Sequence, residues 1–401
     1  MKILIVSYNF PYPPTGGSII RDYNLFKQLA KHHELYWIVV TKKDDVKEQD
    51  IHEMYKYFKE IAIIDLKSKH SGWDFFKSLF SKKPYIFNRF DLDIVSQKSL
   101  EIIERINIDL FFCDHIYLAQ NIPPGIESRI PVIPNNEDHA FTYYYRLARS
   151  NDFVRALYAG LQWRKILKYE IEIYKKYGID LTTSEKEKEL LLAHENNLNI
   201  KVIPNGVDLD YYFPVERKNF TPNVVFVAWY KYFPNEQAVL NFVKNVFPLV
   251  KKQKKDFKFY VVGKEPPGSF SQLGYENDVI ITGEVEDVRP YIANADAVVI
   301  PLSIGGGTRL KVLEAMGMGK PVISTTLGAE GLNAAHKENI LIADDPKQFA
   351  DYIIRLIDDI DYNKKLSLNG RTFVEKNYDW EEIGKKLNEI IVNLKKSNQI
   401  T

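Results

Sequence analysis

Cysteine is almost absent from this sequence, since Cys113 is the single one among 401 residues. One cysteine excludes an intramolecular disulfide and a cysteine-rich zinc site. Long apolar runs are also lacking: residues 3–6 are too few for a signal peptide, and no stretch approaches the roughly 18 to 20 apolar residues of a membrane span. We therefore expect a cytoplasmic protein whose contact with a membrane, if any, is peripheral at its inner face.

An excess of either charge is lacking too. The chain has 54 basic and 53 acidic residues, a formal net charge of +1. This balance excludes the overall basic character of nucleic-acid-binding proteins, so we expect no nucleic-acid partner. With 45% apolar and 13% aromatic residues the chain can build ordinary cores. At about 150 residues per domain, its length predicts two or three of them.

Short β-branched apolar runs alternate with helical patterns along the chain. This alternation predicts parallel sheets covered by helices on both faces. The runs form two series of about six, which predicts an α/β protein with two doubly wound, Rossmann-like domains. The first series comprises residues 3–6, 35–40, 61–65, 110–113, 132–133 and 181–183, and the second comprises 224–228, 259–263, 279–282, 297–301, 322–324 and 340–342.

The junction between the two series is expected near residues 204–222. Turn-forming residues start it, and the polar stretch 216–222 suggests an exposed linker. We therefore expect one domain over residues 1–204 and another over 205–377, followed by a terminal helix within 378–401. A further helix should start at Asp345, an N-cap residue followed by proline and then by glutamine.

A triple-glycine loop is the strongest chemical signal. The apolar strand at 297–301 runs into residues 305–307, which are all glycine, and a helix follows that carries Arg309 and Lys311. Ligands of open α/β sheets bind beyond the carboxyl ends of the strands, and glycines let the backbone approach them. A helix N-terminus with two cations favours an anion. The loop therefore predicts a phosphate or diphosphate site.

Glu314 lies farther along the same predicted helix. Its carboxylate suits the two neighbouring hydroxyls of a ribose. In the alternative interpretation, Lys311 and Glu314 form an exposed pair three residues apart and the glycines only make a turn. A Walker loop for nucleoside-triphosphate hydrolysis is disfavoured, because Pro321 follows Lys320 and Glu314 stands at the position of the first glycine.

Several segments together have the order and spacing of a known family. At these residues the chain resembles glycosyltransferase family 4 (group 1), which has the GT-B fold, and the resemblance covers nearly the whole chain. The similar segments are residues 9–17 with Arg21, 202–208, 213–214, 226–238, 261–263, 283, 287–291, 295–296, 305–317 and 321–331.

The resemblance implies a hexosyltransferase-type enzyme that moves a sugar from a nucleotide-diphosphate sugar to an acceptor. It implies retention of anomeric configuration, no cofactor and no bound metal. The C-terminal domain would bind the donor, of the UDP, GDP or TDP type. The N-terminal domain, completed by the returning terminal helix, would bind a glycan, lipid-linked or glycoconjugate acceptor. Common uses of such families suggest cell-surface polysaccharide biosynthesis.

On the donor side, Glu314 matches the second glutamate of the family's paired-glutamate motif, which binds the donor ribose. Gly306 stands at the position of the first, so this chain departs from the family at the residue that usually contacts the donor hexose. We expect Arg309 and Lys311 to act as catalytic residues that stabilise charge on the leaving diphosphate, with backbone amides of the loop. The expected donor-binding set is Gly16, Gly17, Gly306, Gly307, Thr308, Arg309, Lys311, Glu314 and Val285.

On the acceptor side, the family often has a histidine after its fourth or fifth strand. Pro134 occupies that position here, and His139 or His115 is the candidate substitute, with His139 as the third candidate catalytic residue. The alternative for either histidine is a structural role. The expected acceptor-side set is Arg21, Asn135, Glu137, His139 and His115.

Two other features have plain alternatives. The Asp-x-Asp sequences at 91–93 and 208–210 resemble a metal-binding motif of another glycosyltransferase fold, but their surroundings differ, and we expect no metal there.

Residues 143–176 are basic and aromatic, with apolar residues at helical spacing. They predict one long amphipathic helix on the N-terminal sheet, or a surface that docks on an anionic membrane.

Two other functions stay open. Loss of the first glutamate at Gly306 favours a nucleotide-sugar-binding subunit without turnover. A GT-B epimerase or hydrolase of nucleotide sugars is the other alternative. Donor-dependent release of nucleoside diphosphate, with and without acceptor, separates these three functions.

Overall fold

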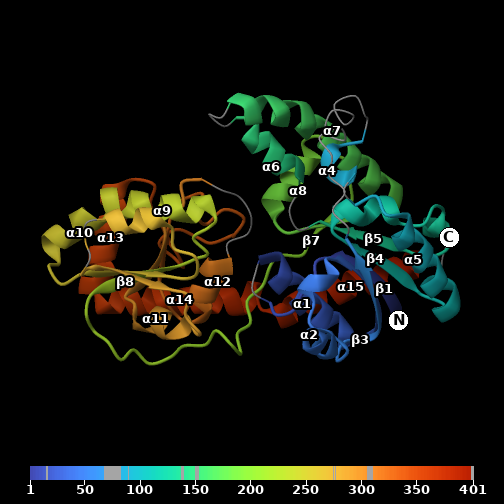
Figure 1. Cartoon of the computed structure of the whole chain (residues 1–401). Coiled ribbons are helices and arrows are strands. Elements are labelled where there is room, and N and C mark those ends of the chain that lie inside the picture. The colour runs from blue at the N-terminus through green and yellow to red at the C-terminus, as the bar shows by residue number, and fades with distance from the viewer. Residues whose placement is uncertain are drawn as a thin grey trace. The chain divides into compact units, whose positions relative to one another are not determined.

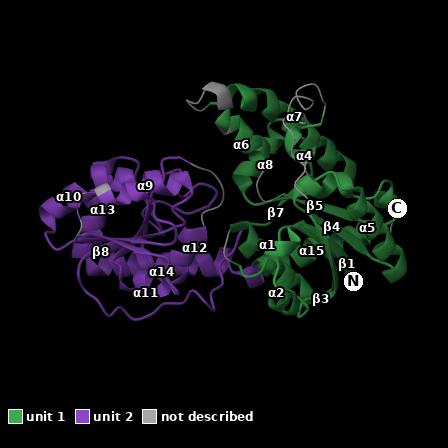
Figure 2. Ribbon diagram, viewed as in Figure 1, with its two compact units in different colours: residues 1–204, 383–401 green, residues 205–382 purple. Residues whose placement is uncertain are grey.

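The computed structural model describes residues 1–14, 17–66, 83–88, 90–136, 140–149, 153–273, 275, 277–304 and 310–398. The chain forms two compact units, one of residues 1–204 with 383–401 and one of residues 205–382 (Figure 2). The last helix, α15 (Trp380–Asn398), starts in the second unit, and its residues from Ile383 onward belong to the first. Each unit is a parallel sheet covered by helices, which confirms the predicted fold class.

The first unit contains a seven-stranded sheet. Its strands are β1 (Lys2–Tyr8), β2 (Glu34–Thr41), β3 (Phe58–Asp65), β4 (Leu110–Asp114), β5 (Val132–Asn135), β6 (Asp180–Thr182) and β7 (Ile200–Val202). They lie in the order β3-β2-β1-β4-β5-β6-β7, and all their pairings are parallel. The six predicted strands are present. The seventh, β7, was missed because it has three residues, with the exposed Lys201 at its centre.

Helices cover both faces of this sheet (Figure 1). Side chains alternate along β1: Leu4 and Val6 belong to the same buried cluster as Ile102 of α5, whereas Trp37 of β2 stacks on Phe58 and contacts Phe26 of α1. The helices of this unit are α1 (Gly17–Ala30), α2 (Glu48–Met54), α4 (Tyr85–Asn88), α5 (Asp93–Ile106), α6 (Ala140–Leu147), α7 (Phe153–Tyr177) and α8 (Glu185–Leu192).

The long helix predicted over residues 143–176 is wrong, because the structure has the two helices α6 and α7 in its place. α6 ends at Leu147 and a turn follows at residues 148–149. The sequence between the helices, residues 150–152, is Ser-Asn-Asp, which contains residue types that favour caps and turns over helix interiors. Apolar spacing continued across this interruption and concealed it.

The second unit contains a six-stranded parallel sheet. Its strands are β8 (Asn223–Val227), β9 (Lys258–Val262), β10 (Val279–Gly283), β11 (Ala297–Ile300), β12 (Val322–Ser324) and β13 (Leu341–Ile342). They lie in the order β10-β9-β8-β11-β12-β13. The helices are α9 (Phe233–Asn245), α10 (Phe247–Gln253), α11 (Arg289–Asn294), α12 (Leu310–Gly317), α13 (Pro346–Asp358) and α14 (Ile360–Asn377).

Helices α9, α10 and α13 lie on one face of this sheet, and α11 and α14 lie on the other (Figure 1). The predicted start of α13 is confirmed, since the Asp345 side chain accepts a hydrogen bond from the backbone N–H of Gln348 at 2.9 Å. None of the helices in the described ranges has the length and apolar character needed to cross a membrane.

The predicted linker is exposed at residues 213–216 and 218–220, and it is also anchored to the second unit. Val207 N donates to Tyr378 O at 2.8 Å. Arg217 forms an ion pair with Asp296. The Asn294 side chain accepts hydrogen bonds from two backbone N–H groups of the same segment. The polar stretch 216–222 therefore both faces solvent and forms polar contacts with the second unit.

The strand orders locate the site. In an open parallel sheet, ligands bind at the carboxyl edge where the strand order reverses. The reversal lies between β1 and β4 in the first unit and between β8 and β11 in the second. The loops after these strands carry most of the residues that the sequence predicted to be functional.

Candidate functional site

Lys311 reaches from α12 toward β8 and the first turn of α9. Its Nζ donates to Asn235 Oδ1 at 3.1 Å and lies 4.8 Å from the ring centroid of Phe226 on β8. Asn235 Nδ2 in turn donates to the carbonyl of Trp229 at 2.8 Å. Asn235 and Phe226 therefore hold the ammonium group of Lys311 at the switch point of the sheet, between β8 and β11. This geometry disagrees with the alternative that Lys311 is only half of an exposed surface pair.

Glu314 lies about one turn farther along α12 and is partly buried. Burial raises the pKa of its carboxyl group, whereas a hydrogen bond from the Tyr212 side chain and the charge of Lys311 lower it. Burial and the Glu314 carboxylate both raise the pKa of Tyr212. Burial is the largest of these effects, so the pKa of the Glu314 carboxyl group is raised above its usual value. In its ionised form a carboxylate has about four lone-pair sites that can accept hydrogen bonds from a ligand.

The glycine-rich parts of the predicted donor site lie outside the described residues. This applies to Gly16, Gly306, Gly307, Thr308 and Arg309. Their roles therefore remain predictions.

Two other predicted donor residues are described. Gly17 is the first residue of α1, at the carboxyl end of β1 in the other unit. Val285 lies in the loop after β10 and is partly buried. A role of its backbone in base recognition remains a prediction.

In the first unit, a buried polar cluster lies at the corresponding switch point. Arg21 on α1 is completely buried, and its guanidinium donates to Pro204 O at 3.0 Å and to Asn135 Oδ1 at 3.5 Å. Asn135 Nδ2 donates to Asp114 Oδ1 at 2.5 Å. His115 N also donates to Asn135 O at 3.0 Å. Three of the predicted acceptor-side residues are thereby brought together from α1, β5 and the end of β4.

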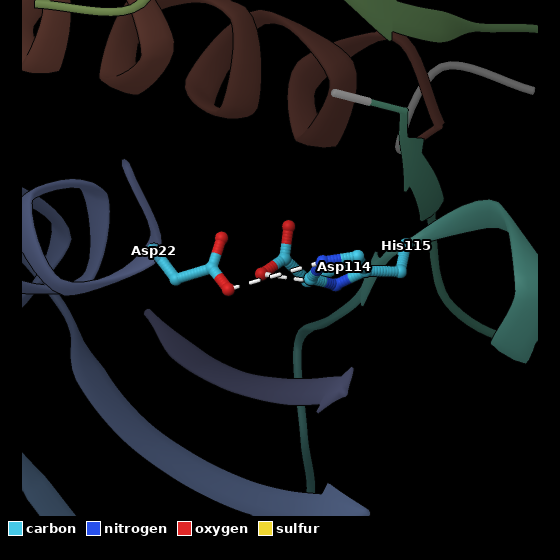
Figure 3. A group of neighbouring side chains, drawn as sticks. All are labelled: Asp22, Asp114 and His115. Atoms are coloured by element: carbon cyan, nitrogen blue, oxygen red, sulfur yellow. Dashed lines mark ion pairs between the residues drawn. The ribbon is translucent and has the colours of Figure 1, made fainter. Parts of the chain in front are cut away.

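The imidazole of His115 lies close to the two buried carboxylates of Asp22 and Asp114, which come from different elements (Figure 3). Its Nε2 is 4.0 Å from Asp22 Oδ2, and its Nδ1 is 3.8 Å from Asp114 Oδ2. His115 has a φ of 80°, which is uncommon for a residue other than glycine and occurs most often at functional sites. His115 directly follows β4, at the carboxyl edge of the sheet.

Sequence reasoning missed Asp22 and Asp114. Each is adjacent in the chain to a predicted residue, Arg21 or His115, which was the available signal. Glu137 and His139 lie outside the described residues, so the role of His139 as a catalytic residue remains a prediction.

Asp22, Asp114 and His115 have ligand atoms within 4.8 Å of one another, the kind of set that holds cations in proteins. Asn135 links this set to the Arg21 guanidinium, whose charge opposes a second cation. In the two Asp-x-Asp sequences, Asp208 Oδ1 accepts hydrogen bonds from two backbone N–H groups of its own turn, and Asp91 is paired with Lys83. Transfer without a metal remains our prediction.

Comparisons with known proteins agree with this architecture. Residues 221–359 match the model of the family described as Glycosyl transferases group 1. Over 399 residues the chain is 24% identical to an uncharacterized 44.6 kDa protein in the cps region of Klebsiella pneumoniae, and the match covers 95% of this chain and 97% of that protein.

Two solved structures are similar over nearly their whole length. Sucrose-phosphate synthase from Thermosynechococcus elongatus has a TM-score of 0.70 at 17% identity, over 98% of each chain. HepE from Anabaena, in complex with UDP-glucose, has a TM-score of 0.67 at 15% identity, over 98% of this chain and 100% of that one. The chain therefore has the GT-B fold, and its residues 221–359 are similar to the glycosyl transferase group 1 domain.

Proposed function

We propose that this chain is a glycosyltransferase that moves a hexosyl group from a nucleotide-diphosphate sugar to a glycan, lipid-linked or glycoconjugate acceptor. The observation that carries the proposal is the placement of Lys311 and Glu314 at the switch point of a unit that matches the group 1 family. The second unit binds the donor and the first binds the acceptor. UDP-glucose bound to HepE favours a UDP-type donor, with GDP and TDP sugars as alternatives.

In the proposed mechanism, cleavage of the sugar–phosphate bond develops negative charge on the leaving nucleoside diphosphate. Preorganised cations at that position lower the barrier. Lys311 is preorganised by Asn235 and Phe226, and Arg309 supplies a second positive charge from the adjacent sequence. Glu314 accepts hydrogen bonds from the donor ribose. The sugar is transferred with retention of configuration and without a metal ion.

The direct test is donor-dependent release of nucleoside diphosphate from UDP-, GDP- and TDP-sugars, with and without a glycan acceptor. A transferase releases the diphosphate faster when acceptor is present and forms a glycosylated product. Release at the same rate without acceptor indicates a hydrolase, and conversion of the donor sugar without release indicates an epimerase. Donor binding without any turnover indicates the alternative of a non-catalytic subunit.

For the acceptor side, we expect His115→Ala to lower kcat/KM for the acceptor by about 10- to 100-fold, the range for loss of one charge-assisted hydrogen bond. Donor affinity should stay within about twofold, because donor recognition lies in the second unit. The matched control is His194→Ala, an exposed histidine of the same unit. Equal acceptor kinetics in the two variants would remove His115 from the acceptor site.

We infer the cellular role from the genomic region in which a relative of this chain is found. A relative in a cps region supports a role in cell-surface polysaccharide biosynthesis. We place the enzyme in the cytoplasm, docked peripherally on the inner face of the membrane, where lipid-linked acceptors are found.

Membrane docking has a specific candidate surface on α6 and α7, which pack together through ring contacts such as Tyr145 with Trp163. Leu157 and Leu161 of α7 are 61% and 55% exposed, and Arg164 and Lys168 continue the same face of the helix. An apolar stripe that continues into basic side chains suits an anionic lipid surface.

Wild-type protein should therefore cosediment with vesicles that contain anionic phosphatidylglycerol, and less so at high salt. The double variant Leu157→Glu, Leu161→Glu should lower this binding at least tenfold, since each buried leucine contributes about 1.5–3 kcal/mol. Leu368→Glu, on α14 of the second unit and 67% exposed, is the matched control. Salt-insensitive or absent binding of the wild type would contradict membrane docking.

A further inference from the structure

Trp229 is an exposed tryptophan in the loop that follows β8, at the switch point of the second sheet. The residue is 47% exposed, whereas the next residue, Tyr230, is buried and its ring packs on that of Phe270 at 5.3 Å between centroids. Among the described residues, no aromatic ring packs on the Trp229 indole. An exposed indole of this kind presents a flat apolar face to a ligand.

The backbone of Trp229 is fixed on both sides. The N–H of the residue before it donates to Val262 O at 3.0 Å, and the N–H of Tyr230 donates to Lys264 O at 3.1 Å. The carbonyl of Trp229 itself accepts a hydrogen bond from Asn235 Nδ2 at 2.8 Å. The loops after β8 and β9 are therefore joined at this point, and Trp229 has a defined position before any ligand arrives.

The indole is fixed at its edge as well. Its Nε1–H donates to the Glu265 carboxylate, and the Lys264 ammonium lies 6.0 Å from the ring centroid. Glu265 has a φ of 53°, a conformation that is uncommon outside glycine and that concentrates at functional sites. Glu265 is exposed, and an ionised carboxylate has about four lone-pair sites, so one indole N–H leaves most of them available to a ligand.

An aromatic face with a carboxylate at its edge suits a sugar ring. A pyranose has a face of C–H groups, which packs on an aromatic ring, and hydroxyl groups around its edge, which donate to carboxylates. The position favours the sugar of the donor over its base. Asn235 donates to the Trp229 carbonyl and accepts from Lys311 Nζ at 3.1 Å, so one residue joins Trp229 to the cation proposed for the diphosphate. The hexosyl group is bonded directly to that diphosphate, whereas the ribose separates the base from it.

We propose that Trp229 and Glu265 bind the hexosyl group of the donor, with the indole against its C–H face and the carboxylate on its hydroxyl groups. The inference rests on the proposed function of the second unit as the donor site. Because the indole is fixed before the donor binds, little side-chain freedom is lost on binding. Removal of the indole should therefore weaken binding of the nucleotide sugar and leave binding of the nucleoside diphosphate unchanged.

The experiment is isothermal titration calorimetry on the full chain with three pairs of ligands: UDP and UDP-glucose, GDP and GDP-mannose, and TDP and TDP-glucose. The pair that the wild type binds most tightly is then used for the variants. Trp229→Ala should lower the affinity for the nucleotide sugar about tenfold, the size of one aromatic contact. Its affinity for the nucleoside diphosphate should stay within about twofold, which also shows that the second unit is folded.

Three further variants define the contact. Trp229→Phe keeps an aromatic face and should stay within about threefold of the wild type. Glu265→Gln keeps an acceptor for the indole but loses the charge, and it should lower the affinity for the nucleotide sugar about threefold. Phe220→Ala is the matched control, because Phe220 is 77% exposed and lies 5.5 Å from the Arg217 guanidinium carbon but precedes β8. It should change neither affinity.

The outcomes separate the two levels of the proposal. If Trp229→Ala weakens binding of the diphosphate and of the nucleotide sugar equally, the indole contacts the nucleotide and its role in sugar binding is wrong, while the donor site stands. If Trp229→Ala binds both ligands as the wild type does, Trp229 does not contact the donor and the inference is wrong. If the wild type binds none of the six ligands, the proposed function fails and the inference fails with it.

Discussion

Replacing Lys311 by alanine is expected to lower kcat about 100- to 1,000-fold at saturating donor. This is the range found when one preorganised group is removed from the place where charge develops in a transition state, about 2.7–4 kcal/mol. The expectation follows from the contacts of the ammonium, which Asn235 and Phe226 hold in place without a ligand. A cation that is already positioned costs no reorganisation during the reaction, so its removal should affect kcat more than donor affinity.

Steady-state release of nucleoside diphosphate measures this effect. Lys244→Ala is the matched control, because Lys244 lies on α9 like Asn235 but is exposed. The melting temperature of both variants should be recorded, since loss of the Lys311 side chain also removes a partner of Asn235. A Lys311→Ala enzyme with wild-type kcat would show that the diphosphate is stabilised by other groups.

Gly263→Ala is expected to destabilise the second unit by about 3 kcal/mol or more, through strain and steric overlap. Gly263 follows β9 and has a φ of 140°, and a Cβ there would lie 1.8 Å from the carbonyl oxygen of Ala228. Ala228 lies in the loop after β8, and its backbone N–H donates to Val262 O at 3.0 Å. Separating the two loops to make room for a Cβ would break the hydrogen bond between Ala228 N and Val262 O.

Calorimetric unfolding is the measurement for this variant, because the two units can unfold separately. For a unit of this size we expect its transition to fall by roughly 6–12 °C. Gly268→Ala is the control: a Cβ at Gly268 would have no atom within 4 Å, and the backbone there needs no positive φ. An unchanged transition in Gly263→Ala would mean that the two loops separate at little cost.

Much of the fold was predictable from the sequence. The positions of the strands that it predicted are confirmed within a few residues, because buried parallel strands are short β-branched runs between helical patterns. The start of α13 at Asp345 was also predictable, because a helix cap depends on residues only three positions apart in the chain. The division of residues 143–176 into α6 and α7 was not, because apolar spacing continues on both sides of the interruption.

The candidate site was predictable only in part. The sequence indicated Lys311 and Glu314 through the glycine loop, and the family resemblance indicated Arg21, Asn135 and His115. It did not indicate their partners, which come from distant parts of the chain. Asn235 approaches Lys311 across 76 residues of sequence, and Tyr212 of the predicted linker packs against Gly317 of α12.

The sequence by itself determined the class of fold, the position of the glycine loop and the type of chemistry that its cations favour, because these depend on residues that are neighbours in the chain. The tertiary structure decided which side chains meet. Arg21 contacts a carbonyl 183 residues away, and Arg371 contacts one 159 residues away. The order of strands in each sheet determines such contacts, and local residue patterns do not encode that order. The same strand order places both polar clusters at the switch points of their sheets.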